Sequence, residues 1–223
     1  DHFIANSKFI ARRIKKVYGR DADVIYPPVN VDRFNICERK DDYFFTASRL
    51  VPYKKMDLIV EAFSQMPDKK LVVIGDGSEM SKIKQKATKN IEILGYQPDA
   101  TMTDYMKKAK AFVFAAEEDF GITPVEAQAC GTPVIAFGKG GVLETIKGLD
   151  QESPTGVFFY EQKVDSLINA VHLFISNQNK IEPKTCRVNS LRFSEQRFRY
   201  EINNYVNEKW LHFSDKKIKA TSY

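Results

Sequence analysis

The sequence has few of the residues that hold small secreted or zinc-dependent domains together. Its 223 residues include only three cysteines and three histidines. Cys37, Cys130 and Cys186 are far apart and form no CxxC pair, so their spacing indicates neither a zinc site nor a disulfide framework. We therefore expect a chain without a metal site, in a reducing, cytoplasmic setting.

Long hydrophobic runs are also missing. The longest wholly apolar run covers residues 111–116, far below the roughly 20 residues that cross a bilayer, and no signal peptide opens the chain. This pattern argues against an integral membrane protein. The first residue is Asp1 rather than methionine, and we expect the chain to be a piece of a longer protein.

The composition is that of a folded globular chain. With 43% hydrophobic and 28% charged residues, it is too apolar to be disordered. Residues 1–20 hold six basic side chains and one acidic one, which accounts for the whole formal charge of +5. Because this excess is confined to one segment and is not interleaved with stacking aromatics, we expect no nucleic-acid partner.

The basic segment has the spacing of an amphipathic helix. Its apolar positions Phe9, Ile10, Ile14 and Val17 recur at helical intervals. One interpretation is a solvated helix face. The other is a patch that makes peripheral contact with an anionic membrane surface. The basic residues are Lys8, Arg12, Arg13, Lys15, Lys16 and Arg20.

Short apolar segments alternate with amphipathic ones along most of the chain. Near-continuous apolar strands between helices are typical of a parallel sheet covered on both faces, because right-handed crossovers place helices over each face. The sequence therefore predicts a doubly wound, Rossmann-like α/β fold. The predicted strands span 23–26, where Pro27 and Pro28 stop the strand, and then 43–47, 70–75, 91–94, 111–115, 133–137 and 155–159. The predicted helices, after the basic one, span 55–66, 78–89, 99–110, 124–130, 142–146, 165–177 and 194–213.

Three cationic side chains follow the strand 43–47, namely Arg49, Lys54 and Lys55. In open α/β sheets, ligands bind outside the carboxyl ends of the strands. Arginine offers a planar fork of donors that suits phosphate, and lysine a movable charge. The position therefore indicates a phosphate site, and the alternative is a set of solvated loop charges.

Two glycines, Gly75 and Gly77, follow the next strand and permit close approach of a ligand to the backbone. A dinucleotide fingerprint needs Gly or Ala three residues after Gly77, where this chain has Met80. The alternative is a tight turn in which Ser78 caps the following helix.

The segment after the strand 111–115 combines acidic residues, a glycine and a helix start. The pattern predicts a helix that begins at Thr123, whose free N–H groups and dipole favour a phosphate. Glu126 has a second interpretation, because Thr123-Pro-Val-Glu126 fits the capping box, in which the glutamate bonds back to the N-cap amide.

Glu118 and Glu126 are separated by seven residues, with Phe120-Gly-Ile122 between them. This spacing resembles the E-x7-E motif of retaining glycosyltransferases of the GT-B fold, in the large group 1 family (family 4) that includes bacterial mannosyl- and glucosyltransferases. The resemblance covers about residues 1–159. It also rests on Ser48-Arg-Leu-Val-Pro-Tyr-Lys54, Gly75-Asp-Gly77, Leu94-Gly95 and Gly140-Gly-Val-Leu-Glu144, in that order.

The resemblance implies that this chain is the carboxy-terminal, donor-binding half of a GT-B enzyme. Residues 1–213 would form the nucleotide-sugar binding domain and 214–223 a frayed polar tail, and the amino-terminal acceptor domain would be absent from this chain. The enzyme would transfer a hexose, mannose or glucose, from a nucleotide-diphosphate sugar to a glycan or lipid-linked acceptor. It would retain anomeric configuration and use no metal or other cofactor, and the fragment alone would be inactive.

The resemblance also implies residue roles. Arg49, Lys54 and Glu118 would be catalytic: the two cations neutralise the departing diphosphate, and Glu118 holds the sugar. Glu126 would accept hydrogen bonds from the ribose, and backbone groups near Gln97 would meet the base. Many relatives have glycine where this chain has Lys55, so the phosphate ligand is either Lys54 or Lys55. The residues expected to bind the nucleotide-sugar are Gly75, Gly77, Gln97, Phe120, Gly121, Ile122, Thr123 and Glu126.

Two other functions remain open. A non-catalytic nucleotide-sugar binding module would be expected to lose Arg49 or Glu118, and both are present. Epimerases and phosphorylases share the architecture, since fold does not fix function. The E-x7-E spacing argues against an epimerase, and a phosphorylase would need a lysine that carries pyridoxal phosphate.

Overall fold

The centre of the molecule is a six-stranded sheet in which all strands are parallel. The computed structural model describes residues 2–220, and from residue 215 onward only the backbone. The strand order is β5-β4-β3-β6-β7-β8. The strands are β3 (Phe44–Ala47), β4 (Leu71–Ile74), β5 (Ile91–Ile93), β6 (Ala111–Phe114), β7 (Val134–Phe137) and β8 (Gly156–Phe159).

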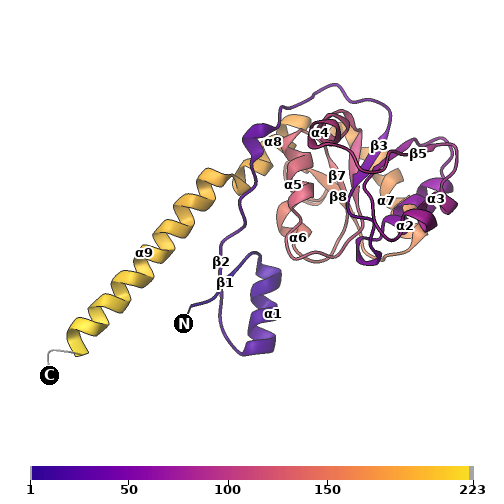
Figure 1. Cartoon of the computed structure of the whole chain (residues 1–223). Coiled ribbons are helices and arrows are strands. Elements are labelled where there is room, and N and C mark those ends of the chain that lie inside the picture. The colour runs from indigo at the N-terminus through magenta and orange to yellow at the C-terminus, as the bar shows by residue number, and fades with distance from the viewer. Residues whose placement is uncertain (1, 221–223) are drawn as a thin grey trace.

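Helices cover both faces of this sheet, as Figure 1 shows. Buried residues of α2, α3 and α7 pack in one core cluster, and those of α4, α5 and α6 in a second one. Successive strand residues alternate between the clusters, so Phe44 belongs to the first and Phe45 to the second. These helices are α2 (Met56–Ser64), α3 (Met80–Lys86), α4 (Asp99–Lys108), α5 (Ile122–Ala129), α6 (Val142–Thr145) and α7 (Val164–Asn177).

The predicted doubly wound α/β fold is confirmed, and the six predicted strands from residue 43 onward lie within one residue of their observed bounds. Five of these strands are buried almost throughout, and the edge strand β5 is buried only at Ile91. Continuous apolar sequence is what a strand buried on both faces requires. The pattern of apolar runs therefore located the sheet.

The first residues form a separate unit outside the six-stranded sheet. β1 (Ile4–Ala5) and β2 (Asp23–Val24) pair in parallel, and α1 (Lys8–Tyr18) joins them. The strand predicted to begin at Asp23 and to stop before Pro27 is thus only two residues long, and α1 has no buried residue. Figure 1 shows this unit beside the α/β body, on the same side as the long helix α9, which extends away from the body.

Glu144 connects this unit to the α/β body. Its carboxylate accepts hydrogen bonds from the backbone N–H groups of Lys8 (2.9 Å) and Phe9 (3.0 Å), and from the Tyr26 hydroxyl (3.0 Å). The α1 amides belong to the first helical turn, where N–H groups have no partner within the helix and favour a negative charge. Ser7 caps the same helix through Ile10.

The carboxy-terminal part is more helical than predicted. The helix α8 (Pro183–Ser190) was not predicted, and α9 (Glu195–Ala220) continues past the predicted end at 213. The backbone is therefore helical in part of the segment expected as a tail, and 221–223 lie outside the described residues. None of the helices in residues 2–220 combines the length and apolarity needed to span a bilayer. Four short 3-10 turns are η1 (Val31–Arg33), η2 (Pro52–Lys54), η3 (Gln178–Lys180) and η4 (Leu191–Phe193).

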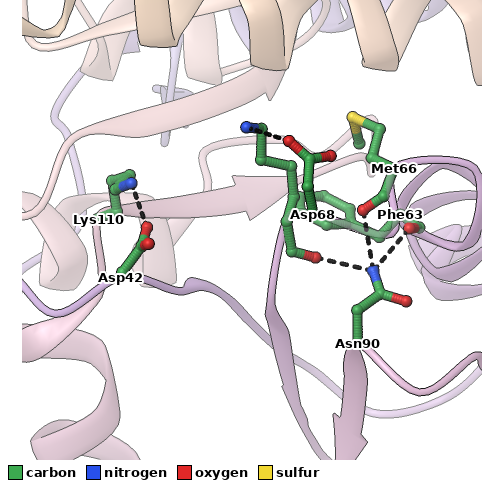
Figure 2. Close-up of polar contacts among 7 residues, drawn as sticks. Asp42, Phe63, Met66, Asp68, Asn90 and Lys110 are labelled. Carbon is green, nitrogen blue, oxygen red and sulfur yellow. Dashed lines mark hydrogen bonds and ion pairs between the residues drawn. The ribbon is translucent and has the colours of Figure 1, made fainter.

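One asparagine ties the loop after α2 to the start of β5. The amide nitrogen of Asn90 donates to the carbonyl oxygens of Phe63 (2.9 Å), Met66 (3.1 Å) and Lys69 (2.8 Å), as Figure 2 shows. Its side-chain oxygen accepts from the Thr88 hydroxyl (2.6 Å). The Phe63 and Met66 carbonyls also accept backbone hydrogen bonds, from the N–H groups of Met66 and Lys69, so Asn90 adds a second donor to each of them and ties the loop to the sheet.

We expect Asn90→Ala to lower the free energy of unfolding by about 1–3 kcal/mol, because the loop after α2 loses its side-chain hydrogen bonds to the residue before β5. The measurement is urea unfolding followed by circular dichroism. Asn177→Ala is the matched control, since Asn177 also donates to a carbonyl, that of Leu173, but in an exposed position. It should change stability by less than about 0.5 kcal/mol. Equal losses in the two variants would contradict the role given to Asn90.

Candidate functional site

The order of the strands reverses between β3 and β6. From β3 the chain adds β4 and β5 on one side, and it then returns to add β6, β7 and β8 on the other side. At such a switch point the loops after the two central strands diverge and leave a crevice at their carboxyl ends. Residues 48–55 follow β3 and residues 115–121 follow β6. The predicted catalytic residues Arg49, Lys54 and Glu118 lie in these two loops.

A hollow of about 310 Å³ lies at the carboxyl ends of β3 and β4. Arg49, Gly75, Tyr96, Gln97 and Thr123 are among the residues that line it. The Tyr96 side chain is 77% exposed, so it offers an open aromatic face. The Gln97 amide nitrogen donates to the carbonyl of Leu94 at 2.8 Å, which fixes this side chain in the wall. The hollow therefore has one largely apolar end and one cationic end.

A second hollow, of about 580 Å³, adjoins the first one, because Thr123 lines both. Its walls bring together predicted residues from two loops and from the start of α5. They include Lys54, Glu118, Phe120, Gly121 and Ile122. Six of the residues predicted to hold sugar or phosphate therefore face one continuous space.

Lys54 and Glu118 form an ion pair across this second hollow. Their side chains are only 17% and 22% exposed. Burial, and then the neighbouring Arg49 guanidinium, lower the pKa of Lys54. The Arg49 guanidinium itself donates weakly to the Tyr53 hydroxyl at 3.4 Å. Two cations and one carboxylate thus lie together at the switch point.

Lys55 lines another hollow, although it follows Lys54 directly. Its backbone is left-handed, with φ of 55°, and the third hollow that it lines contains Phe9 and Arg13 of α1 and shares three residues with the second hollow. Left-handed backbone favours glycine, which is the residue that the resemblance places at this position. Of the two lysines, only Lys54 lines the hollow that contains Glu118 and the start of α5.

The start of α5 differs from the prediction. The helix begins at Ile122, and its N-cap is Gly121 with φ of 89° and ψ of 73°. Thr123 is thus the second helical residue and not the cap. The capping-box interpretation of Glu126 is wrong, because this glutamate accepts a hydrogen bond from Arg33 at 3.1 Å instead. Gly121, Ile122 and Thr123 line the second hollow, and the N–H groups of a first helical turn have no acceptors within the helix, which suits an anion site.

Gly75 and Gly77 allow two loops to touch. A Cβ on Gly75 would lie 1.8 Å from the carbonyl oxygen of Ser48, and one on Gly77 would lie 2.6 Å from that of Leu50. Of the two glycines, only Gly75 lines the hollow. Their first role is therefore to seat the loop that carries Arg49. The predicted Ser78 cap is wrong, because α3 begins at Met80 after Glu79.

A second pair of glycines supports the loop of Glu118. Gly140 and Glu118 form an isolated parallel β-bridge, and the Gly141 amide donates to the Glu118 carbonyl at 2.8 Å. A Cβ on Gly141 would lie 2.3 Å from the carbonyl oxygen of Asp119. The Gly140-Gly-Val-Leu-Glu144 segment thus has two structural tasks, since Glu144 also holds α1.

Glu126 lies one helical turn beyond Thr123 and does not line either hollow. Its side chain is 16% exposed and reaches toward Arg33 of η1, which also binds Asp99 of α4. Burial raises the pKa of Glu126, whereas Arg33 lowers it. The sequence analysis missed Arg33 and Asp99, because no local motif links three residues so far apart in the chain.

Comparison with known proteins identifies glycosyltransferases as relatives of this chain. The family model described as Glycosyl transferases group 1 matches residues 31–190. An uncharacterised glycosyltransferase of Methanocaldococcus jannaschii is 31% identical, over 76% of this chain and 50% of its own length. A GDP-mannose-dependent monoacylated alpha-(1-6)-phosphatidylinositol monomannoside mannosyltransferase of Corynebacterium glutamicum is 32% identical, over 63% of this chain and 45% of its own. The chain spans about half the length of these relatives.

Solved structures share the fold. The sucrose-phosphate synthase of Thermosynechococcus elongatus superposes with a TM-score of 0.81 at 19% identity, and covers 94% of this chain and 58% of its own. Anabaena HepE, solved in complex with UDP and glucose, has a TM-score of 0.79 at 20% identity, over 92% and 62% of the two chains. At these identities the likeness concerns the fold alone, a Rossmann-like α/β fold that glycosyltransferases of the GT-B type contain.

We expect Gly75→Ala to lower the free energy of unfolding by about 3 kcal/mol or more, since the new Cβ forces backbone atoms apart. Gly95→Ala is the matched control, because Gly95 has φ of 66° but no atom within 4 Å of its added Cβ. It should cost about 1 kcal/mol, the strain of left-handed backbone alone. Thermal and urea unfolding of both variants measure the difference. Similar losses would show that the contact with Ser48 is easily relieved.

Proposed function

Because this chain belongs to the glycosyl transferases group 1, we propose that it binds a nucleotide-diphosphate sugar as the donor half of a retaining, metal-independent hexosyltransferase. The observation that carries this proposal is the convergence of Arg49, Lys54, Glu118 and the α5 N-terminus on one continuous space at the switch point of the sheet. Nucleotides bind at such points in open α/β sheets.

The diphosphate occupies the boundary between the two hollows. Arg49 lies in the first hollow, Lys54 in the second, and Thr123 in both. The first-turn amides of α5 add donors and a favourable dipole. These groups supply the positive charge that a departing diphosphate needs, which supports a reaction without a metal ion.

The nucleoside and the sugar then point in opposite directions. The base enters the first hollow between Tyr96 and Gln97, and Gly75 leaves room for its approach. The sugar enters the second hollow, where Glu118 accepts hydrogen bonds from its hydroxyls. Names of relatives support mannose or glucose, since one is GDP-mannose-dependent and one neighbour was solved with UDP and glucose.

The reaction follows from this placement. The bond between the anomeric carbon and the diphosphate oxygen breaks, and both bonding electrons leave with the phosphate. The acceptor oxygen attacks the oxocarbenium-like carbon on the same face, and its proton passes to the departing phosphate oxygen. Arg49 and Lys54 stabilise the charge that develops on the leaving group, which is the largest catalytic contribution expected from fixed cations.

An amino-terminal acceptor domain is the proposed partner. Apolar side chains are exposed on the N-terminal unit and on α9, which contact each other through the rings of His2 and Tyr205 at 6.5 Å. Such clusters of exposed apolar side chains mark interaction surfaces. Those exposed are Ile4, Val17, Tyr18, Tyr200, Val206, Trp210, Leu211 and Phe213. The basic face of α1 supports a further, peripheral contact with anionic lipid.

Isothermal titration of this chain against UDP, GDP and ADP tests the proposal. We expect one of the three to bind with one-to-one stoichiometry, and the same affinity in EDTA, because protein cations carry the phosphate charge. Radiolabelled sugar transfer by the chain alone should be absent. Failure of all three nucleotides to bind at millimolar concentration would overturn the donor-binding function.

The paired lysines give a sharper test. Lys54→Ala should weaken nucleoside diphosphate binding by about 1.5–3 kcal/mol, the contribution of a hydrogen bond to a charged group. Lys55→Ala is the matched control and should leave affinity unchanged, because Lys55 does not line the hollow that contains Glu118 and the start of α5. Titration calorimetry of the two variants decides. A loss in Lys55→Ala alone would make Lys55 the phosphate ligand.

A further inference from the structure

One arginine connects three segments beside the candidate site. The Arg33 guanidinium contacts Asp99 at 2.7 Å through one nitrogen and at 3.3 Å through the other, and the second nitrogen also contacts Glu126 at 3.1 Å. Arg33 ends η1, Asp99 begins α4 and Glu126 lies in α5. These contacts therefore fix the position of the Glu126 carboxylate relative to the loop that precedes the sheet.

The guanidinium has little freedom to leave this position. It lies over the ring of Phe34, with its carbon 4.4 Å from the ring centroid, and Phe34 is buried. Stacking on an aromatic face is a favourable placement for arginine. Asp99 and Phe34 thus orient Arg33 before any ligand arrives.

Glu126 needs a partner where it lies. Its side chain is 16% exposed, and burial of an unpaired carboxylate is costly. Arg33 uses one carboxylate oxygen, Oε1, and no other side chain in the described part of the chain bonds to Glu126. The second oxygen remains available on the same face of α5 as Thr123, which lines both hollows.

We propose that Arg33 is a positioning residue for the nucleotide: it holds Glu126 ionised and oriented, so that the free carboxylate oxygen accepts a ribose hydroxyl of the donor. This inference rests on the proposed donor-binding function. Asp99 in turn holds Arg33. Selection of a ribonucleotide is therefore a property of the triad Asp99, Arg33 and Glu126, and not of the glutamate alone.

Lysine is not equivalent to arginine at this position. The fork of Arg33 meets Asp99 through two nitrogens while one of them still reaches Glu126. An ammonium group is a single point charge on a flexible stem, so it supplies charge without this geometry. Arg33→Lys should therefore restore the ionisation of Glu126 but only part of its orientation.

The experiment compares each nucleotide with its 2′,3′-dideoxy form by titration calorimetry of the whole chain. Wild type should prefer the ribonucleotide. In Arg33→Ala the ribonucleotide should bind about tenfold more weakly, whereas the dideoxy form should bind as in wild type. Arg33→Lys and Asp99→Asn should give intermediate losses. Arg199→Ala, which removes an exposed arginine paired with Glu195 on α9, is the matched control and should change nothing.

The pH dependence of ribonucleotide binding is a second readout, and it would not change if Arg33 had a purely structural role. The groups facing Glu126 are Arg33 from η1, Asp99 from α4 and Cys130, the residue that follows α5. Burial raises the pKa of Cys130 to about 12, so this thiol stays neutral. Without Arg33, the pKa of Glu126 rises further. Ribonucleotide affinity should then fall on acidification at a higher pH than in wild type. Glu126→Gln is the control for this measurement, because glutamine does not titrate and the remaining pH dependence then comes from the nucleotide phosphate.

The outcomes separate this inference from the function on which it rests. If wild type binds a nucleoside diphosphate but Arg33→Ala keeps both the ribose preference and the pH midpoint, Arg33 is a structural tie and the inference is overturned. If wild type binds none of the nucleotides, the donor-binding function fails as well. Should Arg33→Ala not fold, Arg33→Lys and Asp99→Asn decide by the ribose preference, which should shrink in both variants. A preference unchanged from wild type in both variants would overturn the inference.

Discussion

The reversal of strand order between β3 and β6 is the constraint on which the site depends. Two adjacent parallel strands send their connections to opposite sides, and the backbone cannot fill the space between the diverging loops. The loops that border this space carry Arg49 and Glu118. Pairs of glycines then seat each loop against its neighbour, because the backbones touch at distances that no side chain would permit. The cations and the carboxylate are thereby fixed on a rigid frame, which is what binding of a charged ligand requires.

Much of the architecture could be predicted from the sequence. Strands buried on both faces need continuous apolar residues, so runs such as 111–115 located the sheet to within one residue. The crevice residues could also be predicted, because a residue that follows a strand of a parallel sheet must lie at the carboxyl edge. Lys54 and Glu118 were expected at one site on these grounds, and they form an ion pair there.

The local sequence pattern at the start of α5 did not predict where the helix begins or which partners its side chains have. The sequence Thr123-Pro-Val-Glu126 satisfies a capping box, but Gly121 adopts left-handed backbone and starts the helix earlier, so the side chains take other partners. The true partner of Glu126 is Arg33, 93 positions away in the sequence. Glu144 binds amides that are 135 and 136 positions away. Contacts of this range depend on the tertiary fold, and a single sequence carries no spacing that reveals them.

The ion pair between Lys54 and Glu118 would give the proposed donor site a form of chemical selectivity. A ligand that binds between them in the second hollow must separate two opposite charges that compensate each other at low exposure. A free hexose brings hydroxyl groups alone and offers no anion to Lys54 in exchange. In the proposed function, a diphosphate would replace the carboxylate as the partner of the lysine, and it would release Glu118 to bind the sugar hydroxyls. Such a site would discriminate against the unactivated sugar by the cost of breaking its own ion pair.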